Sequence, residues 1–331
     1  MPALPPQKFV DAILDAIQES SWAGMLLNAP RNNPRRFLIT KEDRSLPLCV
    51  YIWTLTPGGR PSLRHEFRVQ MTGVSSPLKV ETDGPTVIMG YEPSLKVFGG
   101  FDLQKHRVFT QGSPSVQIDV RTLQKALQDG LAFGRKDNDE ITVGIRPDQF
   151  VNYVLGAQEF HGEGKSKATF DLLAKAAQPH ARVTPADLGA LSGPRQRLVQ
   201  QVSRLSRSAS FRQQILQAYD HRCAVTRMQL KLVDAAHILP VGAPGSTDLV
   251  CNGLALSPTI HRAYDFGLVF LNAKYEMKIS EERADMLASL GLEGGLPQMK
   301  LWMGPIHLPP DKKQWPDQDI IRKANMFRNV K

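Results

Sequence analysis

Two histidines and an asparagine stand close together in the C-terminal third of the chain. His237 lies near the end of an apolar-rich run, residues 229–241, that we expect to be a strand. The pair Asn252 and Gly253 is expected at a turn. His261 lies in residues 258–267, which begin with proline, end with glycine and predict a short helix. Imidazole titrates near neutral pH, so His237 is a candidate general base that removes a proton from water.

Four short motifs surround these residues in a fixed order. A hairpin is expected after the helix, over residues 268–279. Together the motifs resemble the HNH nucleases, and the resemblance covers about residues 208–282. The motifs are C-A-V-T from Cys223, A-A-H-I-L-P from Ala235, N-G-L-A-L from Asn252 and H-R-A-Y-D-F-G from His261.

The HNH resemblance implies a ββα-metal nuclease domain with His237, Asn252 and His261 as its catalytic core. It assigns His261 to one divalent cation per active site, Mg²⁺ or Mn²⁺, and Asn252 to holding the loop and the catalytic imidazole. The cation would act as a Lewis acid on a phosphate oxygen and stabilise the leaving oxygen. The products implied are 5′-phosphate and 3′-hydroxyl ends.

One position departs from the pattern of many HNH enzymes, which place a metal-binding Asp or His immediately before the general base. This chain has Ala236 there. Asp234 shares a strand face with Ala236, and Asp265 follows His261 by one helical turn. Asp248 lies in the intervening loop. The second metal ligand is therefore open, with Asp265 preferred to Asp234.

The first half of the chain predicts one mainly antiparallel, β-rich α+β domain over residues 1–160. Residues 7–20 have the apolar spacing of an amphipathic helix. Residues 37–109 alternate short β-branched and aromatic runs with turn signals, and a helix is expected from 147 to 158. We expect this domain to choose the DNA target. Its strand arginines Arg64 and Arg68 are candidate DNA contacts, and four aromatic residues, Trp53, Tyr91, Phe98 and Phe101, are candidates for stacking on a flipped base or, more simply, for the sheet core.

Residues 161–207 predict a connector that contains a basic helix, and residues 208–331 predict the nuclease domain with a C-terminal extension. The helix is expected to break at Ser208–Ser210. No acidic residue occurs between Leu188 and Tyr219. Such one-sided charge favours a phosphate-facing helix. The candidate DNA contacts here are Arg195, Arg197, Arg204, Arg207 and Arg212, together with Arg262 in the HNH segment.

Composition agrees with a polyanion-binding protein. The net charge is +9 and the pI is about 9.5, and basic proteins bind nucleic acids through counterion release. The three cysteines form no C-x-x-C pair, so a four-cysteine zinc site is excluded, and we expect Cys223 and Cys251 to be packing residues. No long apolar run predicts a membrane span, and the N-terminal sequence does not resemble a secretion signal. A cytoplasmic protein is expected.

The sequence therefore predicts a metal-dependent DNA endonuclease of restriction or phage-defence type. Its partner is double-stranded DNA, with base-modified DNA as a candidate target. Because one HNH site cuts one strand, a homodimer is a further hypothesis. Two alternatives stay open: an HNH effector gated by a small nucleotide or a protein signal, and a non-catalytic DNA-binding regulator.

Overall fold

The computed structural model describes residues 4–58, 63–110, 114–163 and 166–330. The chain divides into two compact units, unit 1 (Met1–Ala209) and unit 2 (Ser210–Lys331). Both units mix helices and strands, which confirms the predicted α+β class. Of the helices in the described ranges, none has the length and hydropathy that crossing a bilayer requires.

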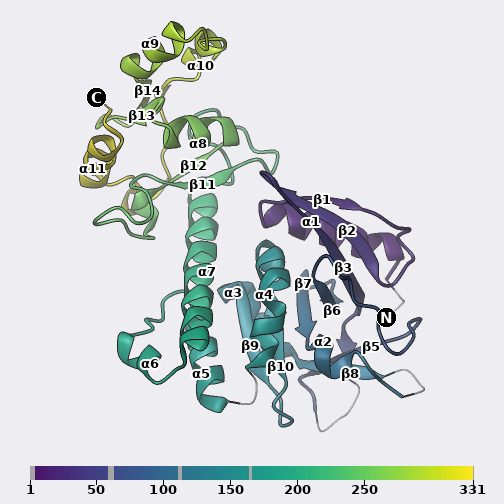
Figure 1. Cartoon of the computed structure of the whole chain (residues 1–331). Helices are drawn as coiled ribbons and strands as arrows, with labels where there is room; N and C mark the ends of the chain where they lie inside the picture. Colours follow the sequence, from purple (N-terminus) through teal and green to yellow (C-terminus); the bar gives the residue numbers. More distant parts are fainter. Residues whose placement is uncertain (1–3, 59–62, 111–113, 164–165, 331) are drawn as a thin grey trace. The chain divides into compact units, whose positions relative to one another are not determined.

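Unit 1 is built on a seven-stranded sheet in the order β1-β2-β3-β6-β7-β10-β9 (Figure 1). Neighbouring strands are antiparallel except for β3 and β6, so the prediction of a mainly antiparallel sheet is confirmed. The strands are β1 (Ala23–Leu26), β2 (Arg35–Lys41), β3 (Arg44–Thr54), β6 (Thr86–Glu92), β7 (Val97–Phe101), β9 (Leu131–Arg135) and β10 (Ile141–Ile145).

Both faces of this sheet are covered. A small sheet, β4 (Thr56–Pro57), β5 (Glu66–Gln70) and β8 (Ser115–Asp119), packs with Leu123 of helix α3 (Val120–Asp129) against the face that carries Tyr51 and Trp53. Helices pack on the face that carries Val50 and Ile52. Successive side chains of β3 point to opposite faces of the sheet and are buried on both, which explains why its sequence is a continuous apolar run. The helices on the second face are α1 (Pro6–Glu19), α4 (Phe150–Gly162), α5 (Lys167–Ala176) and the first part of α7 (Gly193–Ala218).

Residues 161–207, expected as a connector, lie within unit 1. They contain α5, α6 (Pro185–Gly189) and most of α7, and Leu173 and Val202 are fully buried in the core. The expected break at Ser208–Ser210 is wrong, because α7 runs through these residues without interruption. Alanine and serine lack the ring of proline and the freedom of glycine, so they do not end a helix by themselves.

Unit 2 begins with a ββα arrangement. Strand β11 (Asp234–His237) pairs antiparallel with β12 (Gly253–Leu256), and helix α8 (Pro258–Asp265) follows. The expected hairpin forms as β13 (Val269–Leu271) and β14 (Glu276–Ile279), joined by β15 (Gly304–Pro305). The unit ends with helices α9 (Glu281–Ser289), α10 (Leu296–Lys300) and α11 (Gln318–Arg328).

Two local predictions in unit 2 are wrong. The strand expected over residues 229–241 is only four residues long, and the positive φ angles of Leu230 and Lys231 turn the chain before it. Gly253 is not a turn residue: it has extended φ and ψ angles of −136° and 152° and begins β12. The limits of β11 are set by its pairing with β12. Apolar alternation and an Asn-Gly pair in the sequence do not reveal which strand will be the partner.

Candidate active site

His237 is the last residue of β11 and lies opposite Gly253 of β12. Its Nε2 is 3.0 Å from Oδ1 of Asp248, a residue of the loop between the two strands. One face of the imidazole stacks on the Phe211 ring from α7, with centroids 3.8 Å apart and planes inclined by 13°. The side chain keeps 17% of its surface exposed. Asp248 therefore holds one edge of the imidazole and Phe211 covers one face, while part of the ring stays accessible to solvent.

Gly253 lets α7 approach the strand opposite His237. A Cβ atom at this position would lie 2.1 Å from Cδ1 of Ile215 and 2.9 Å from Cζ of Phe211. Both contacts come from the C-terminal part of α7, which belongs to unit 2. Glycine is needed here for close packing and not for a special backbone angle.

Asn252 is fully buried and fastens the loop between β11 and β12. Its Oδ1 accepts a hydrogen bond of 2.8 Å from the backbone N–H of Leu239. Its Nδ2 donates to the carbonyl of Thr247 at 2.7 Å and lies 3.3 Å from Oγ of Ser246. A buried amide with its bonding capacity satisfied fixes the loop that carries Asp248.

His261 lies between two aspartates. Its Nδ1 is 3.6 Å from Oδ2 of Asp234, and its Nε2 is 3.4 Å from Oδ2 of Asp265. Asp234 is the main cause of a raised His261 pKa, burial acts against it, and Asp265 adds to the increase. The two aspartates favoured at the sequence level thus meet the same imidazole, but at opposite nitrogens, whereas Asp248 pairs with His237.

The donor set at His261 consists of oxygen and nitrogen atoms, which suit Mg²⁺ or Mn²⁺. The side chains as they stand are not gathered round one point: across the described ranges, no group of three or more His, Cys, Asp or Glu residues could hold a metal ion. His261 and Asp265 share the Nε2 side and could bind one cation together with water. Cys223 is buried and Cys251 is partly buried, and both are free thiols.

Three arginines form an exposed stripe on α7. Arg197, Arg204 and Arg207 are exposed, and their spacings of seven and three residues place them on one helical face. Within the part of the chain that the structure describes, Arg197 and Arg204 have no carboxylate at ion-pair distance. Arg195 differs, because its Nε lies 2.7 Å from Glu163. We call Arg197, Arg204 and Arg207 the arginine stripe.

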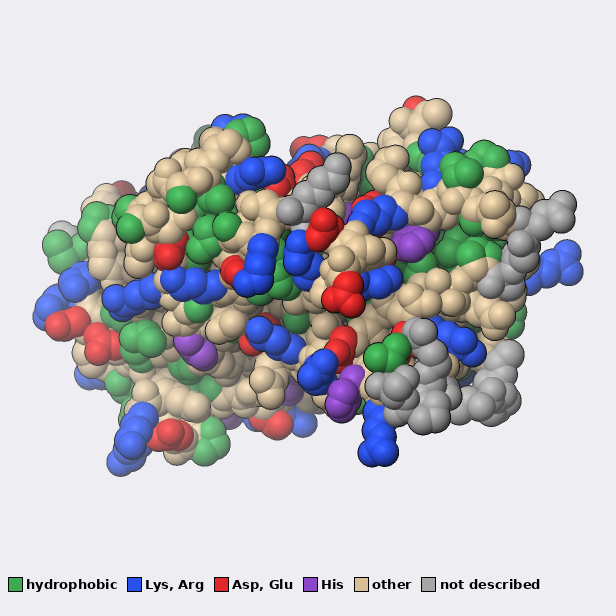
Figure 2. All heavy atoms as spheres, turned by 90° about the horizontal axis from the view of Figure 1, so that it is seen from below, with side chains coloured by type: hydrophobic (Ala, Val, Ile, Leu, Met, Phe, Trp, Pro, Cys, Tyr) green, Lys and Arg blue, Asp and Glu red, His purple; other side chains and the backbone are tan. Residues whose placement is uncertain are grey.

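The remaining candidate DNA contacts are scattered over both units. Arg212 is half-buried on the unit 2 part of α7, and Arg262 on α8 lies over the Phe266 ring at 5.6 Å. Arg68 is exposed on β5. Arg64 lines a cavity of about 510 Å³ in unit 1, where Arg121 is paired with Asp119. Figure 2 shows Lys and Arg side chains beside Asp and Glu side chains on the face it draws, so positive charge is not segregated there.

The aromatic residues considered for base stacking belong to the core. Trp53, Phe98 and Phe101 are buried, Tyr91 packs against the core, and the Trp53 indole donates to the carbonyl of Thr72. The simpler interpretation of these residues as sheet-core aromatics is therefore confirmed.

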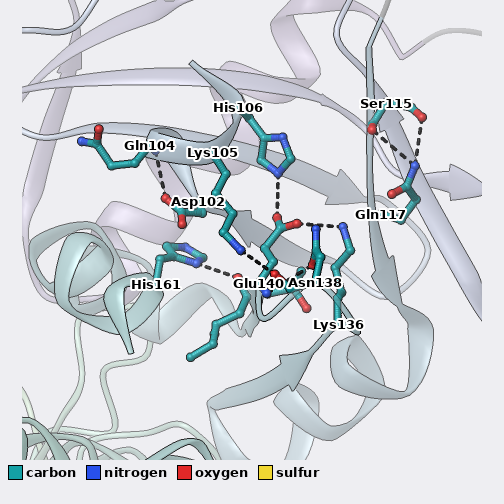
Figure 3. A network of polar contacts seen from close by, with 12 residues as sticks. Asp102, Gln104, Lys105, His106, Ser115, Gln117, Lys136, Asn138, Glu140 and His161 are labelled. Atoms are coloured by element: carbon teal, nitrogen blue, oxygen red, sulfur yellow. Dashed lines mark hydrogen bonds and ion pairs between the residues drawn. The ribbon is translucent and has the colours of Figure 1, made fainter. Parts of the chain in front are cut away.

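Unit 1 contains a buried charged network that the sequence did not indicate (Figure 3). Glu140 is fully buried, and its carboxylate lies 2.7 Å from Nε2 of His106 and 2.8 Å from Nζ of Lys136. Lys105 donates to the carbonyl of Asn138 at 2.9 Å. These contacts tie α2 (Leu103–His106) to the turn between β9 and β10.

A cavity of about 610 Å³ lies beside this network. Its lining includes the buried pair Tyr153 and His161, whose Oη and Nε2 are 3.0 Å apart. Acidic side chains outnumber basic ones in the lining, where Glu81, Asp102, Asp139 and Glu159 stand against Lys105. This cavity is therefore a poor site for a phosphate.

Two family models match the chain. Residues 223–272 match the model for HNH endonuclease, and residues 47–154 match the model for Methylase-associated X1. The ββα arrangement, the motifs and the family match agree, so the chain carries an HNH endonuclease domain in unit 2 and a methylase-associated X1 domain in unit 1. The predicted HNH relationship is confirmed.

No curated protein matches the chain. Among solved structures, the chain is similar to a modification-dependent TagI restriction endonuclease, with 14% sequence identity and a TM-score of 0.30, over 84% of this chain and 80% of that one. At that TM-score the likeness supports no argument about fold or function.

Proposed function

We propose that this protein is a metal-dependent DNA endonuclease of restriction or phage-defence type, in which unit 2 hydrolyses phosphodiester bonds and unit 1 selects the DNA. The observation that carries this proposal is the pair of His237 and Asp248 within a matched HNH domain. An accessible imidazole fixed by a carboxylate is an arrangement suited to a general base. The domain limits we propose are 1–160 for recognition, 161–207 for the basic helical segment and 208–331 for the nuclease.

His237 is the proposed general base. A carboxylate beside Nε2 favours the tautomer with its proton on that nitrogen, which leaves the lone pair of Nδ1 to accept a proton from water. Asp248 also stabilises the imidazolium that forms. Asn252 is proposed to fix the position of Asp248, because its amide bonds to the loop residues just before that aspartate.

His261 and Asp265 are the proposed ligands of one divalent cation, Mg²⁺ or Mn²⁺. When bound, the cation supplies Lewis-acid stabilisation to the phosphate and the leaving oxygen. Asp234 faces the other nitrogen of His261, so it suits the role of orienting the imidazole by accepting its Nδ1 proton. The two aspartates that were alternatives in the sequence are thus proposed to have different roles, Asp265 as a metal ligand and Asp234 as the residue that orients His261.

DNA is proposed to lie along exposed arginines. The arginine stripe of α7 supports this, because Arg197 and Arg204 carry charge that no neighbouring carboxylate offsets. Arg64, Arg68, Arg212 and Arg262 stay proposed contacts, and Arg195 is weaker because Glu163 neutralises it. A family named for its association with methylases supports placing recognition of base modification in unit 1. A homodimer and a cytoplasmic location stay part of the proposal.

The test is cleavage of matched unmodified, methylated and hydroxymethylated DNA in Mg²⁺ or Mn²⁺. His237→Ala should lower the rate about 100- to 10,000-fold, the usual contribution of a general base. The matched control is His307→Ala, since His307 is an exposed histidine of the same unit. Chelation should abolish cutting, and preference for one DNA would assign recognition to the full chain.

Cutting that survives His237→Ala would overturn the assignment of the base. A wild-type protein that binds DNA but cuts none of the substrates would support the non-catalytic regulator. Cutting that begins only when a small nucleotide is added would support the gated effector.

A further inference from the structure

The last helix of unit 2 is α11, far from the HNH motifs in sequence (Figure 1). It carries Arg328, whose guanidinium is buried. Only 5% of the Arg328 side chain is exposed. Its Nη1 donates a hydrogen bond of 2.7 Å to the carbonyl of Ile238, the residue immediately after His237. A charge-assisted bond in a buried setting is strong and restricts the carbonyl it meets.

The chain that leaves His237 is therefore held on both sides. The Ile238 N–H donates to the carbonyl of Asn252 at 2.9 Å, and the Ile238 carbonyl accepts from Arg328. Ile238 itself is fully buried. These two bonds fix the direction in which the backbone leaves the candidate base, and so they limit how far the imidazole can shift.

The other side of the guanidinium meets α8. It lies over the Tyr264 ring, 4.3 Å from the ring centre, and its Nη2 is 3.8 Å from Oδ1 of Asp265. Within the described residues, Nε and Nη2 make no hydrogen bond. Burying a guanidinium with unused donors is costly, so fold stability alone does not account for an arginine here.

We propose that Arg328 is a positioning residue of the nuclease site. It joins the backbone beside His237 to the last turn of α8, which carries Asp265 one turn after His261. The separation between the candidate base and the candidate metal ligands is then fixed by one buried, planar guanidinium group. Arg328 acts through these residues and does not touch the substrate. This inference rests on the proposed function, although the side-chain geometry can be measured without it.

The experiment compares Arg328→Met and Arg328→Lys with the control Arg322→Met in the full-length protein. Arg322 lies on the same helix, is 68% exposed and pairs with Asp319. Arg328→Met should lower kcat about 10- to 100-fold, the scale expected from a small misplacement of reacting groups. KM should stay within about 2-fold, since the DNA contacts are unchanged. Arg328→Lys should recover part of kcat, because an ammonium can still donate to Ile238.

A spectroscopic readout separates this inference from the nuclease assignment. The ring signals of His237 and His261, identified by their alanine variants, should move in the NMR spectrum of Arg328→Met and stay in place in Arg322→Met. If the wild type cuts no DNA, the proposed function fails and these signals still decide the role of Arg328.

Three results would overturn the proposal. They are unchanged kcat and ring signals in folded Arg328→Met, an equal loss in the Arg322→Met control, and a rise in KM without a fall in kcat. If Arg328→Met does not fold, Arg328→Lys, which keeps the charge, decides on the same measurements.

Discussion

Each unit holds a turn in place with one fully buried polar side chain, and the two side chains differ in charge. Asn252 in unit 2 bonds to backbone groups of the loop between β11 and β12. Glu140 in unit 1 meets the charged or ionisable groups of Lys136 and His106 beside the turn between β9 and β10. The neutral amide forms a network that acid cannot break, whereas the carboxylate forms one that depends on pH.

The two side chains also differ in how far away their partners lie in the sequence. The partners of Asn252 stand five, six and thirteen residues from it. Lys136 stands only four residues from Glu140, but His106 stands thirty-four residues from it. When all the hydrogen-bond partners lie in one loop, they appear as a short motif in the sequence. When some partners come from distant elements, no such motif appears. This difference explains why the Asn252 loop could be interpreted from the sequence and the Glu140 network could not.

Replacing Glu140 should have the largest effect on stability. Burial alone would raise its pKa, but the hydrogen bonds and charges of His106 and Lys136 outweigh burial and lower it to about 2 from a usual 4.5. Glu140→Gln leaves both partners without their carboxylate and should destabilise unit 1 by about 3–5 kcal/mol at neutral pH. Hydrogen exchange read by mass spectrometry reports each unit separately.

The same variant tests the contrast in pH dependence. Because the folded-state pKa of Glu140 is depressed, its contribution is complete above pH 4.5 and is lost as the pH falls towards about 2. Protection of unit 1 should fall through this range in the wild type and vary less in Glu140→Gln. Glu159→Gln, at an exposed carboxylate of the same unit, is the control. Equal acid sensitivity of the wild type and Glu140→Gln would remove Glu140 from the explanation.

The sequence predicted the candidate site where its geometry is local. His237, Asn252 and His261 fall on a strand end, a loop and a helix, and the alternatives Asp234 and Asp265 both lie beside His261. A helix period of about four residues and a strand period of two are enough to bring such groups together. The mainly antiparallel sheet of unit 1 was also predicted from local signals, namely short runs of β-branched and aromatic residues separated by turn residues.

The sequence did not predict the residues that reach the site from elsewhere. Phe211 is separated from His237 by the end of α7 and a loop, and Arg328 comes from the last helix. Gly253 was interpreted as a turn residue because an Asn-Gly pair is typical of turns. Its actual requirement is the contact with Ile215 of α7. The requirement for glycine at this position depends on tertiary packing, which cannot be inferred from a single sequence.

Adding a methyl group at Gly253 tests how much the stability of unit 2 depends on this close packing. The result can be compared with the dependence of unit 1 on the ion pairs of Glu140. The φ of −136° allows alanine, so the effect is steric. Gly253→Ala should destabilise unit 2 by about 1–3 kcal/mol, the usual result of overpacking, and disturb the stacking of Phe211 on His237. Urea unfolding followed by unit-resolved hydrogen exchange measures it. Gly294→Ala, where a Cβ meets no atom within 4 Å, should be neutral. Equal stability of both variants would show that α7 can shift at little cost.

The smallest expected effect is on DNA binding. Its measurement tests whether unit 1 contributes to the affinity for DNA. The double variant Arg197→Gln with Arg204→Gln removes two exposed charges from the unit 1 part of α7. If each contacts a phosphate, the slope of log affinity against log salt should decrease by about 1.8, or roughly 0.9 per contact. Fluorescence anisotropy without divalent metal measures this slope.

The matched control is Arg195→Gln, because Glu163 already neutralises that arginine at 2.7 Å. It should leave the salt dependence nearly unchanged. If the double variant also keeps the wild-type slope, the arginine stripe does not contact the backbone, and DNA binding must be assigned to unit 2 or to the strand arginines of unit 1. A decreased slope with unchanged preference among modified DNAs would place the stripe in backbone binding and leave base recognition to the sheet, since phosphate contacts carry no sequence information.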